Sequence, residues 1–324
     1  MIQEKDKFHI KNWELVSVNP NNRNWTWVNY FNLWAVNIQS LLGFSLIASL
    51  YILYDLNSFA VLTGCLIAGI LVYFFSNIIG KISQSSGLSF PVILRLSMGF
   101  NGARYIGMLR GSVGIFMFGV QTFFISKSIG YLIRIFIYEI DLEILNNQIF
   151  LSFFFGMNLI DWIALVFTFF LQFYIFTSGH TANRKFISFS SAFVYIGLIL
   201  FLIIILSENY NDLVNSLKLS TNIDNYIAKE NILPIITITG TMFAYFSIVI
   251  VNFGDFSRYA KNYKEMNVGN LSLILNIIIF SFFAVLITLG SDIILAKKGI
   301  SVHQLLTNPN DIIAKINNNY LTVI

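Results

Sequence analysis

The chain has 324 residues, of which 56% are hydrophobic and only 11% charged, and its formal net charge is +4. Soluble domains average about 25% charged residues, so this sequence has too few to cover a soluble globule. Its single cysteine, Cys65, excludes an intrachain disulfide and a zinc site built from cysteines. We therefore expect an all-α polytopic membrane protein.

Seven stretches approach or exceed the roughly 20 apolar residues that a helix needs to cross a bilayer core. They are 27–53, 57–79, 105–137, 150–176, 187–206, 233–253 and 269–296. An eighth stretch begins near Asp311 and meets the C-terminus at Ile324 before it is long enough to span. The sequence thus predicts seven membrane helices and an incomplete eighth.

The positions of Lys and Arg predict the orientation of the chain. If the N-terminus is cytoplasmic, the inner segments carry twelve of these residues and the outer segments four. Cytoplasmic segments of membrane proteins are enriched in Lys and Arg. We therefore expect a cytoplasmic N-terminal segment, residues 1–26, on a protein of the plasma or inner membrane. The positive charge then indicates a lipid bilayer as partner and no nucleic acid.

Polar residues interrupt the first and sixth spans. The first contains four amides between positions 29 and 39, and the sixth contains TITGT at 237–241. Such residues face either a transport site or a neighbouring helix. Interrupted spans at corresponding places in two halves are typical of inverted-repeat transporters. The spacing predicts a first repeat at 27–206, an extracytoplasmic loop at 207–232 and an incomplete second repeat at 233–324.

Four motifs follow one another along the chain. They are NPNNRNWTWVNYFNLW (19–34), a loop with FPV and three arginines (80–111), MFGVQT (117–122) and NFGDFSRYAK (252–261). They resemble motifs of the nucleobase–cation symporter-1 family, whose members are cytosine, uracil, allantoin and hydantoin permeases. The resemblance implies a LeuT-type five-plus-five inverted-repeat core. It also implies symport of a planar heterocycle with Na⁺ or H⁺ and no other cofactor or metal.

The resemblance assigns residues to a cation site and to a substrate site. In this family, backbone carbonyls at a break in the first helix bind the cation, and Ala35 and Ile38 match their spacing. Gln39 and Gln121 match glutamines that hydrogen-bond the substrate. Amides suit this role, because their donors and acceptor complement the alternating C=O and N–H groups of a uracil- or hydantoin-like ring.

The stacking residues depart from the family pattern. Met117, one turn before Gln121 on the same helix face, stands where the family often has a tryptophan. Phe246 replaces a second stacking tryptophan, and Tyr245 stands where a small residue is usual. Methionine contacts a ring face less specifically than indole does. We therefore assign Met117, Tyr245 and Phe246 to the substrate site without predicting the exact substrate.

Charged residues in or near the spans each have two interpretations. Asp161, in the fourth span, is either a functional acid or a paired acid near a helix end. Lys127 either serves the site or extends its amine outward. Asp255 and Arg258 form either a local pair or part of a cytoplasmic gate, and we expect the local pair.

The resemblance stops at the C-terminus, where helix eight of the family supplies hydroxyl residues to the cation and an asparagine to the substrate. We expect a truncated transporter sequence that does not transport alone, or one that a second chain completes. The alternative function is a non-transporting accessory or sensor protein derived from the same fold. An enzyme is not expected, because the sequence has no metal-ligand spacing, nucleophile motif or phosphate-binding loop.

Overall fold

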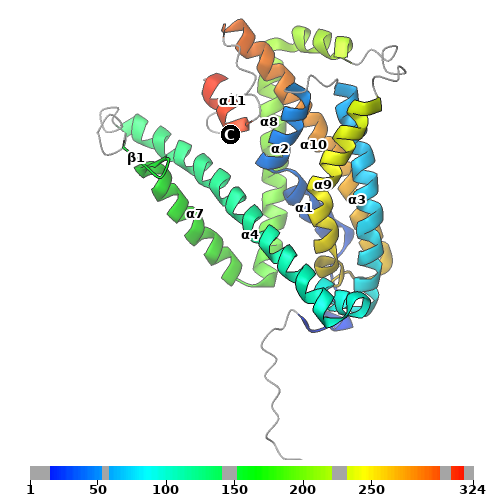
Figure 1. The fold of residues 1–324 in the computed structure, drawn as a ribbon. Helices are drawn as coiled ribbons and strands as arrows, with labels where there is room; N and C mark the ends of the chain where they lie inside the picture. Colours follow the sequence, from blue (N-terminus) through cyan, green and yellow to red (C-terminus); the bar gives the residue numbers. More distant parts are fainter. Residues whose placement is uncertain (1–14, 53–57, 141–151, 221–231, 300–307, 317–324) are drawn as a thin grey trace, which may run out of the picture.

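The computed structural model describes residues 15–52, 58–140, 152–220, 232–299 and 308–316, and these are mostly helical (Figure 1). Among them, six helices are long and apolar enough to cross a membrane, or up to seven if a bent helix pair counts as one span. The six are α3 (Ser58–Ser86), α4 (Phe90–Ile140), α7 (Leu159–Thr177), α8 (His180–Ser220), α9 (Ile232–Ser257) and α10 (Tyr263–Lys297). The protein is therefore a multi-pass integral membrane protein, as the composition predicted.

The first predicted span is broken within its polar stretch. Helices α1 (Trp27–Ile38) and α2 (Leu41–Ile52) are bent by 59° relative to each other. The Ser40 hydroxyl accepts a hydrogen bond from the Gly43 N–H (3.0 Å) at the start of α2. This side chain satisfies one of the backbone donors that the break leaves without a helical partner.

The sixth predicted span has no break that matches the one in the first. Helix α9 is continuous from Ile232 to Ser257. The Thr237 hydroxyl donates to the Leu233 carbonyl (3.0 Å), and the Thr241 hydroxyl donates to the Thr237 carbonyl (2.9 Å). Hydroxyls that bond to the preceding turn are satisfied inside the helix, so they require no break.

Helix α7 begins later than the predicted start at 150. Strands β1 (Phe153–Phe154) and β2 (Met157–Asn158) form a short antiparallel hairpin before it. The turn contains Phe155 and Gly156, with φ of 49° and 76°. The Asn158 side chain then caps the helix by accepting from the Asp161 N–H (2.9 Å). The hairpin and this cap fix the start of α7 at Leu159.

Helix α8 extends into the segment 207–232 that was predicted to be a loop. It continues to Ser220, and residues 221–231 lie outside the described residues. Leu213 in this extension is buried beside Gly290 of α10, where a Cβ atom would come within 2.8 Å of it. Burial of this leucine on α10 gives the extension an apolar contact, which helps to keep it helical.

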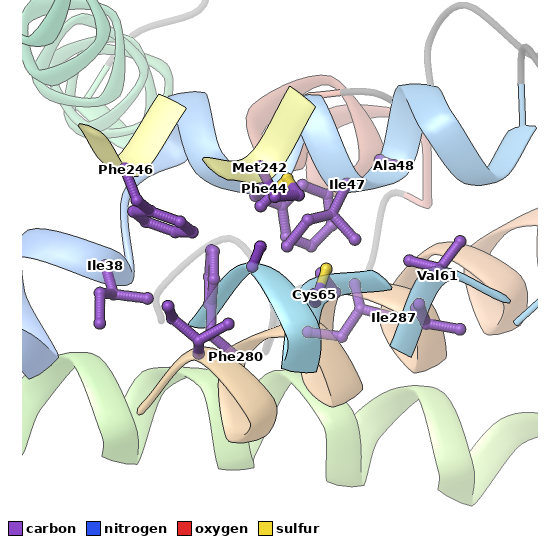
Figure 2. Packing of buried hydrophobic residues seen from close by; sticks show 14 of the residues in the cluster. Ile38, Phe44, Ile47, Ala48, Val61, Cys65, Met242, Phe246, Phe280 and Ile287 are labelled. Carbon is purple, nitrogen blue, oxygen red and sulfur yellow. The ribbon is translucent and has the colours of Figure 1, made fainter. Parts of the chain in front are cut away.

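The core lies where α1, α2, α3, α9 and α10 meet. Figure 2 shows one buried side chain from each of these helices in the same cluster: Ile38, Phe44, Cys65, Met242 and Phe280. Membrane helices associate mainly through close packing, because lipid is as apolar as the side chains themselves. The fit between these helices therefore holds the core together.

Helices α4 and α7 lean away from this core as a pair (Figure 1). Their large apolar side chains are widely exposed, for example Phe116, Phe167 and Phe170. In a membrane protein such surfaces are available to lipid or to other helices. Helix α4 is kinked near its start at Gly99, whose φ is 69°. Because α4 makes few core contacts, polar interactions have a larger part in fixing its position.

The segment before α1 is tied to the end of α9. The Trp25 N–H donates to the Tyr259 carbonyl (2.9 Å), and the Trp25 carbonyl accepts from the Lys261 N–H (2.9 Å). Arg23 donates to the Gln84 carbonyl at the end of α3 (2.6 Å). The first and last of the four sequence motifs are therefore joined by backbone hydrogen bonds.

Replacing Gly269 of α10 by alanine should destabilise the core. A Cβ atom there would lie 2.6 Å from Cβ of Tyr30, which is fully buried in α1. Overpacking of this kind costs about 1–3 kcal/mol. We expect a lower thermal unfolding temperature for the purified protein in detergent. Gly119→Ala in α4 is the control, because nothing lies within 4 Å of its Cβ position. Equal unfolding temperatures for the two variants would contradict this packing.

Candidate functional site

Four of the five residues predicted to bind substrate line one cavity. Met117 and Gln121 come from α4, and Tyr245 and Phe246 come from α9. They enclose a space of about 310 Å³, which we call the central cavity. The cavity lies between the leaning helix α4 and the core helices α1 and α9, so it is within the membrane-spanning part.

Helix α1 adds two polar side chains that the sequence analysis did not assign to the site. Trp34 is 2% exposed, and its indole N–H has no hydrogen-bond partner among the described residues. Asn37 donates through its amide nitrogen to the Leu33 carbonyl (2.7 Å). Both residues line the central cavity, and their spacing of three places them on one helix face. That spacing within the amide-rich stretch was the signal available in the sequence.

The unpaired indole of Trp34 favours a ligand in this cavity. A buried donor without a partner costs about 1–3 kcal/mol. The indole nitrogen is covered by protein atoms, so a carbonyl of a molecule in the cavity reaches the Trp34 N–H only if the cavity wall shifts. The other side chains offer an amide at Gln121, aromatic rings at Tyr245 and Phe246, and a thioether at Met117.

Gln39 does not join the other four predicted substrate residues. It lines a second space of about 440 Å³, the side cavity, which lies between the α1–α2 break and helices α8, α10 and α11 (Pro309–Ile316). Gln39 is 8% exposed, and neither polar atom of its amide has a hydrogen-bond partner in the described part of the chain. The bend carries the residue away from the face that bears Trp34, and a helical repeat does not reveal such a turn.

Asn310 of α11 lies on the same side cavity. Its amide nitrogen donates to the Ser128 hydroxyl of α4 (3.2 Å). Asn310 comes just before the predicted incomplete eighth helix and was not among the residues predicted to bind substrate. Residues 317–324 of that predicted helix lie outside the described residues.

A hydrogen bond marks the boundary between the two cavities. The hydroxyls of Ser40 and Tyr245 are 2.9 Å apart. Ser40 lines the side cavity and Tyr245 lines the central cavity. Tyr245, which replaces the small residue usual in the resembling family, therefore links α9 to the break in the first span.

The two carbonyls predicted to bind a cation lie at this break. The Ala35 carbonyl accepts from the Gln39 N–H (3.1 Å), and the Ile38 carbonyl accepts from the Ser40 N–H (2.9 Å). A carbonyl oxygen has two lone pairs, so each can still contact a cation. The role of these carbonyls stays a prediction.

An ionic cluster joins α4 to α7. The Asp161 carboxylate of α7 accepts from Lys127 (2.7 Å) and from Arg134 (2.6 Å), both on α4. Arg134 also donates to the Asn158 side chain that caps α7 (3.0 Å). Asp161 is 3% exposed, so it is the paired acid of the two interpretations given above. Because α4 also carries Met117 and Gln121, the cluster helps to position the central cavity.

The expected local pair between Asp255 and Arg258 is wrong. The Asp255 carboxylate pairs with Arg110 of α4, and it also accepts from the Phe90 N–H at the start of α4 (2.9 Å). The Arg258 guanidinium instead donates to the backbone carbonyl of Asp255 (3.2 Å). A carboxylate that accepts from a free helix N-terminus and from an arginine satisfies groups on a second helix, which a local pair would leave open.

Comparison with known families decides the class of this protein. A family model described as permease for cytosine/purines, uracil, thiamine, allantoin matches residues 17–322. The chain belongs to this permease family. Membership confirms the family resemblance drawn from the motifs.

Two relatives of this permease are named for allantoin. The chain is 23% identical over 321 residues to the allantoin permease of Bacillus subtilis (strain 168), covering 97% of the chain and 61% of that protein. It is 27% identical over 111 residues to the Escherichia coli (strain K12) protein named "Putative allantoin permease", covering 34% of the chain and 23% of that protein. The chain thus spans about three fifths of the length of the B. subtilis protein, and the match to the E. coli protein covers less. No solved structure gives a significant match.

Replacing Asp161 by asparagine should loosen the α4–α7 pair of this permease. Lys127 and Arg134 would lose their counter-ion, and breaking a buried ion pair costs about 3–5 kcal/mol. We expect a marked fall in thermal unfolding temperature in detergent. Asp292→Asn in α10 is the matched control, because Asp292 forms no ion pair with the described residues. A fall of the same size in both variants would show that the cluster has no special role.

Proposed function

We propose that this permease is a symporter that imports a nucleobase-related planar heterocycle together with Na⁺ or H⁺. The observation that carries the proposal is the central cavity, where Met117, Gln121, Tyr245 and Phe246 meet the unpaired indole N–H of Trp34. These residues come from three helices and from three separate parts of the sequence. We propose a LeuT-type five-plus-five core as the scaffold on the family resemblance and on the break in the first span, although α9 has no matching break.

The chemistry of the cavity suits a flat ring with polar edges. Gln121 offers both donors and an acceptor, and Trp34 offers a donor, so alternating C=O and N–H groups find complements. The rings of Tyr245 and Phe246 lie edge to face, with centroids 5.0 Å apart and an interplanar angle of 61°. One ring can therefore stack on the substrate while the other contacts its edge. The thioether of Met117 can contact the ring face from α4.

The substrate class follows from this chemistry together with the relatives. Both named relatives carry allantoin in their names. Allantoin contains a hydantoin ring with alternating amide groups, so it matches the donors and acceptors of Gln121 and Trp34. We therefore propose allantoin and related hydantoin- or uracil-like compounds as the first substrates to test.

The coupling cation binds at the break between α1 and α2. The Ala35 and Ile38 carbonyls each keep a free lone pair there, and broken membrane helices commonly bind Na⁺ through such carbonyls. Neither the central nor the side cavity is lined by a described carboxylate or histidine that could carry a proton. This favours Na⁺ over H⁺. The excess of Lys and Arg in the predicted inner segments supports a cytoplasmic N-terminus.

Gln121→Ala should reduce substrate binding and uptake. Loss of one or two hydrogen bonds weakens affinity about 5- to 30-fold. The measurement is radiolabelled allantoin binding to the purified protein, followed by uptake into proteoliposomes. Gln172→Ala in α7 is the matched control, because Gln172 hydrogen-bonds Thr122 and lines neither cavity. Unchanged binding by Gln121→Ala would refute its role. Binding without uptake in the unmodified protein would fit a chain that does not transport alone, whereas absence of binding would favour the accessory or sensor function.

Replacing Na⁺ by choline should weaken allantoin binding. Coupling between two bound ligands typically changes affinity about 5- to 150-fold, and the effect is reciprocal. Binding is measured at constant ionic strength and pH in the two salts. Insensitivity to Na⁺ combined with stronger binding at low pH would assign the coupling to H⁺ instead.

A further inference from the structure

A third cavity continues from the central cavity between α4 and α9. It has a volume of about 410 Å³, and we call it the α4–α9 slot. Gly114, Ile248 and Asn252 line both spaces, so the two are contiguous. At its far end the slot is lined by Leu15 of the N-terminal segment and by Asp255. The slot therefore leads from the central cavity toward the N-terminal side of the protein.

Three glycines form part of the α4 wall of the slot, beside Arg110 of the same helix. Gly107, Gly111 and Gly114 recur at intervals of four and three on α4, and nothing lies within 4 Å of the Cβ position of any of them. This spacing places the three glycines on one helix face. The opposite wall is α9, where Ile248 and Asn252 are one turn apart. A glycine face opposite a helix with side chains leaves a space suited to a flat ring.

Several polar groups line the slot. Some have no hydrogen-bond partner among the described residues, and others can bond to a bound ring while they keep their present partner. Ser89 is 3% exposed, and its hydroxyl has no hydrogen-bond partner among the described residues. Asp255 holds Arg110 at one carboxylate oxygen and the Phe90 N–H at the other. Arg110 has five donors in its guanidinium group, so it can donate to a ring carbonyl while it stays paired. The amide of Asn252 offers both donors and an acceptor.

We propose that the α4–α9 slot is a second binding site for planar heterocycles, separate from the central cavity. The proposal rests on the proposed function, because it assumes the same class of substrate. The ring lies against the glycine face of α4, and its polar edge meets Ser89, Asn252 and Arg110. A molecule leaving the central cavity toward the N-terminal side enters this site next. The protein then holds two molecules of substrate in sequence along α4.

The stoichiometry of radiolabelled allantoin binding to the purified full chain tests this site. We expect two molecules per chain at saturation. Gly111→Leu fills the slot without touching the central cavity, and its backbone is helical, so leucine should favour folding. This variant should bind one molecule. Gly119→Leu is the control on the same helix, since Gly119 lines neither space, and it should bind two.

Two further variants separate this proposal from the proposed function. Gln121→Ala should weaken the central site about 5- to 30-fold and leave the slot unchanged. Ser89→Ala should weaken the second site about fivefold, as expected for one hydrogen bond, and leave the first unchanged. If the wild type has a single site that Gln121→Ala weakens and Gly111→Leu leaves unaffected, the slot is not a second binding site. The proposed function would still hold. Absence of allantoin binding to the wild type would overturn both.

Discussion

In lipid, every backbone polar group needs a partner within the protein, and this requirement governs the break between α1 and α2. The Ser40 hydroxyl satisfies the Gly43 N–H, and the Gln39 and Ser40 amides use the carbonyls of Ala35 and Ile38. These bonds satisfy three of the backbone N–H groups at the break. The break separates the residues of the first span into two groups, with Trp34 on the central cavity and Gln39 on the side cavity. Tyr245 then joins α9 to the break through Ser40.

The position of α4 depends on charges rather than on core packing. At its start, Asp255 accepts from the Phe90 N–H and pairs with Arg110. Further along the helix, Asp161 holds Lys127 and Arg134. The residues that line the central cavity and the slot lie between these two attachments. The attachment of α4 therefore depends on a few polar contacts, whereas the core helices approach one another closely at glycines.

Local patterns in the sequence predicted the membrane helices and part of the candidate site. They could not predict contacts between residues that lie far apart in the sequence. Apolar length predicted the spans, and the amides predicted the break in the first of them. Helical periodicity placed Met117 and Gln121 on one face. Periodicity says nothing about direction beyond a bend, so it did not separate Gln39 from the other site residues. The ion pair between Asp255 and Arg110 also could not be predicted, because the two residues lie on helices that are far apart in the sequence. The threonines of α9 were misleading, since hydroxyls that face a cavity and hydroxyls that bond to their own helix look alike in sequence.

Among the buried polar groups that lack a hydrogen-bond partner in the described part of the chain are the indole N–H of Trp34 and the amide of Gln39, and these two residues line different cavities. Each costs about 1–3 kcal/mol while it is unsatisfied. One small heterocycle in the central cavity can satisfy Trp34 if the cavity wall shifts, but Gln39 lies beyond the Ser40–Tyr245 hydrogen bond. A substrate that contacts both therefore requires either this bond to open or the bend to change. Because the carbonyls of Ala35 and Ile38 lie at the same bend, a cation bound there would bias its geometry. The bond between Ser40 and Tyr245 thus offers a direct physical link between cation binding and the shape of the substrate site.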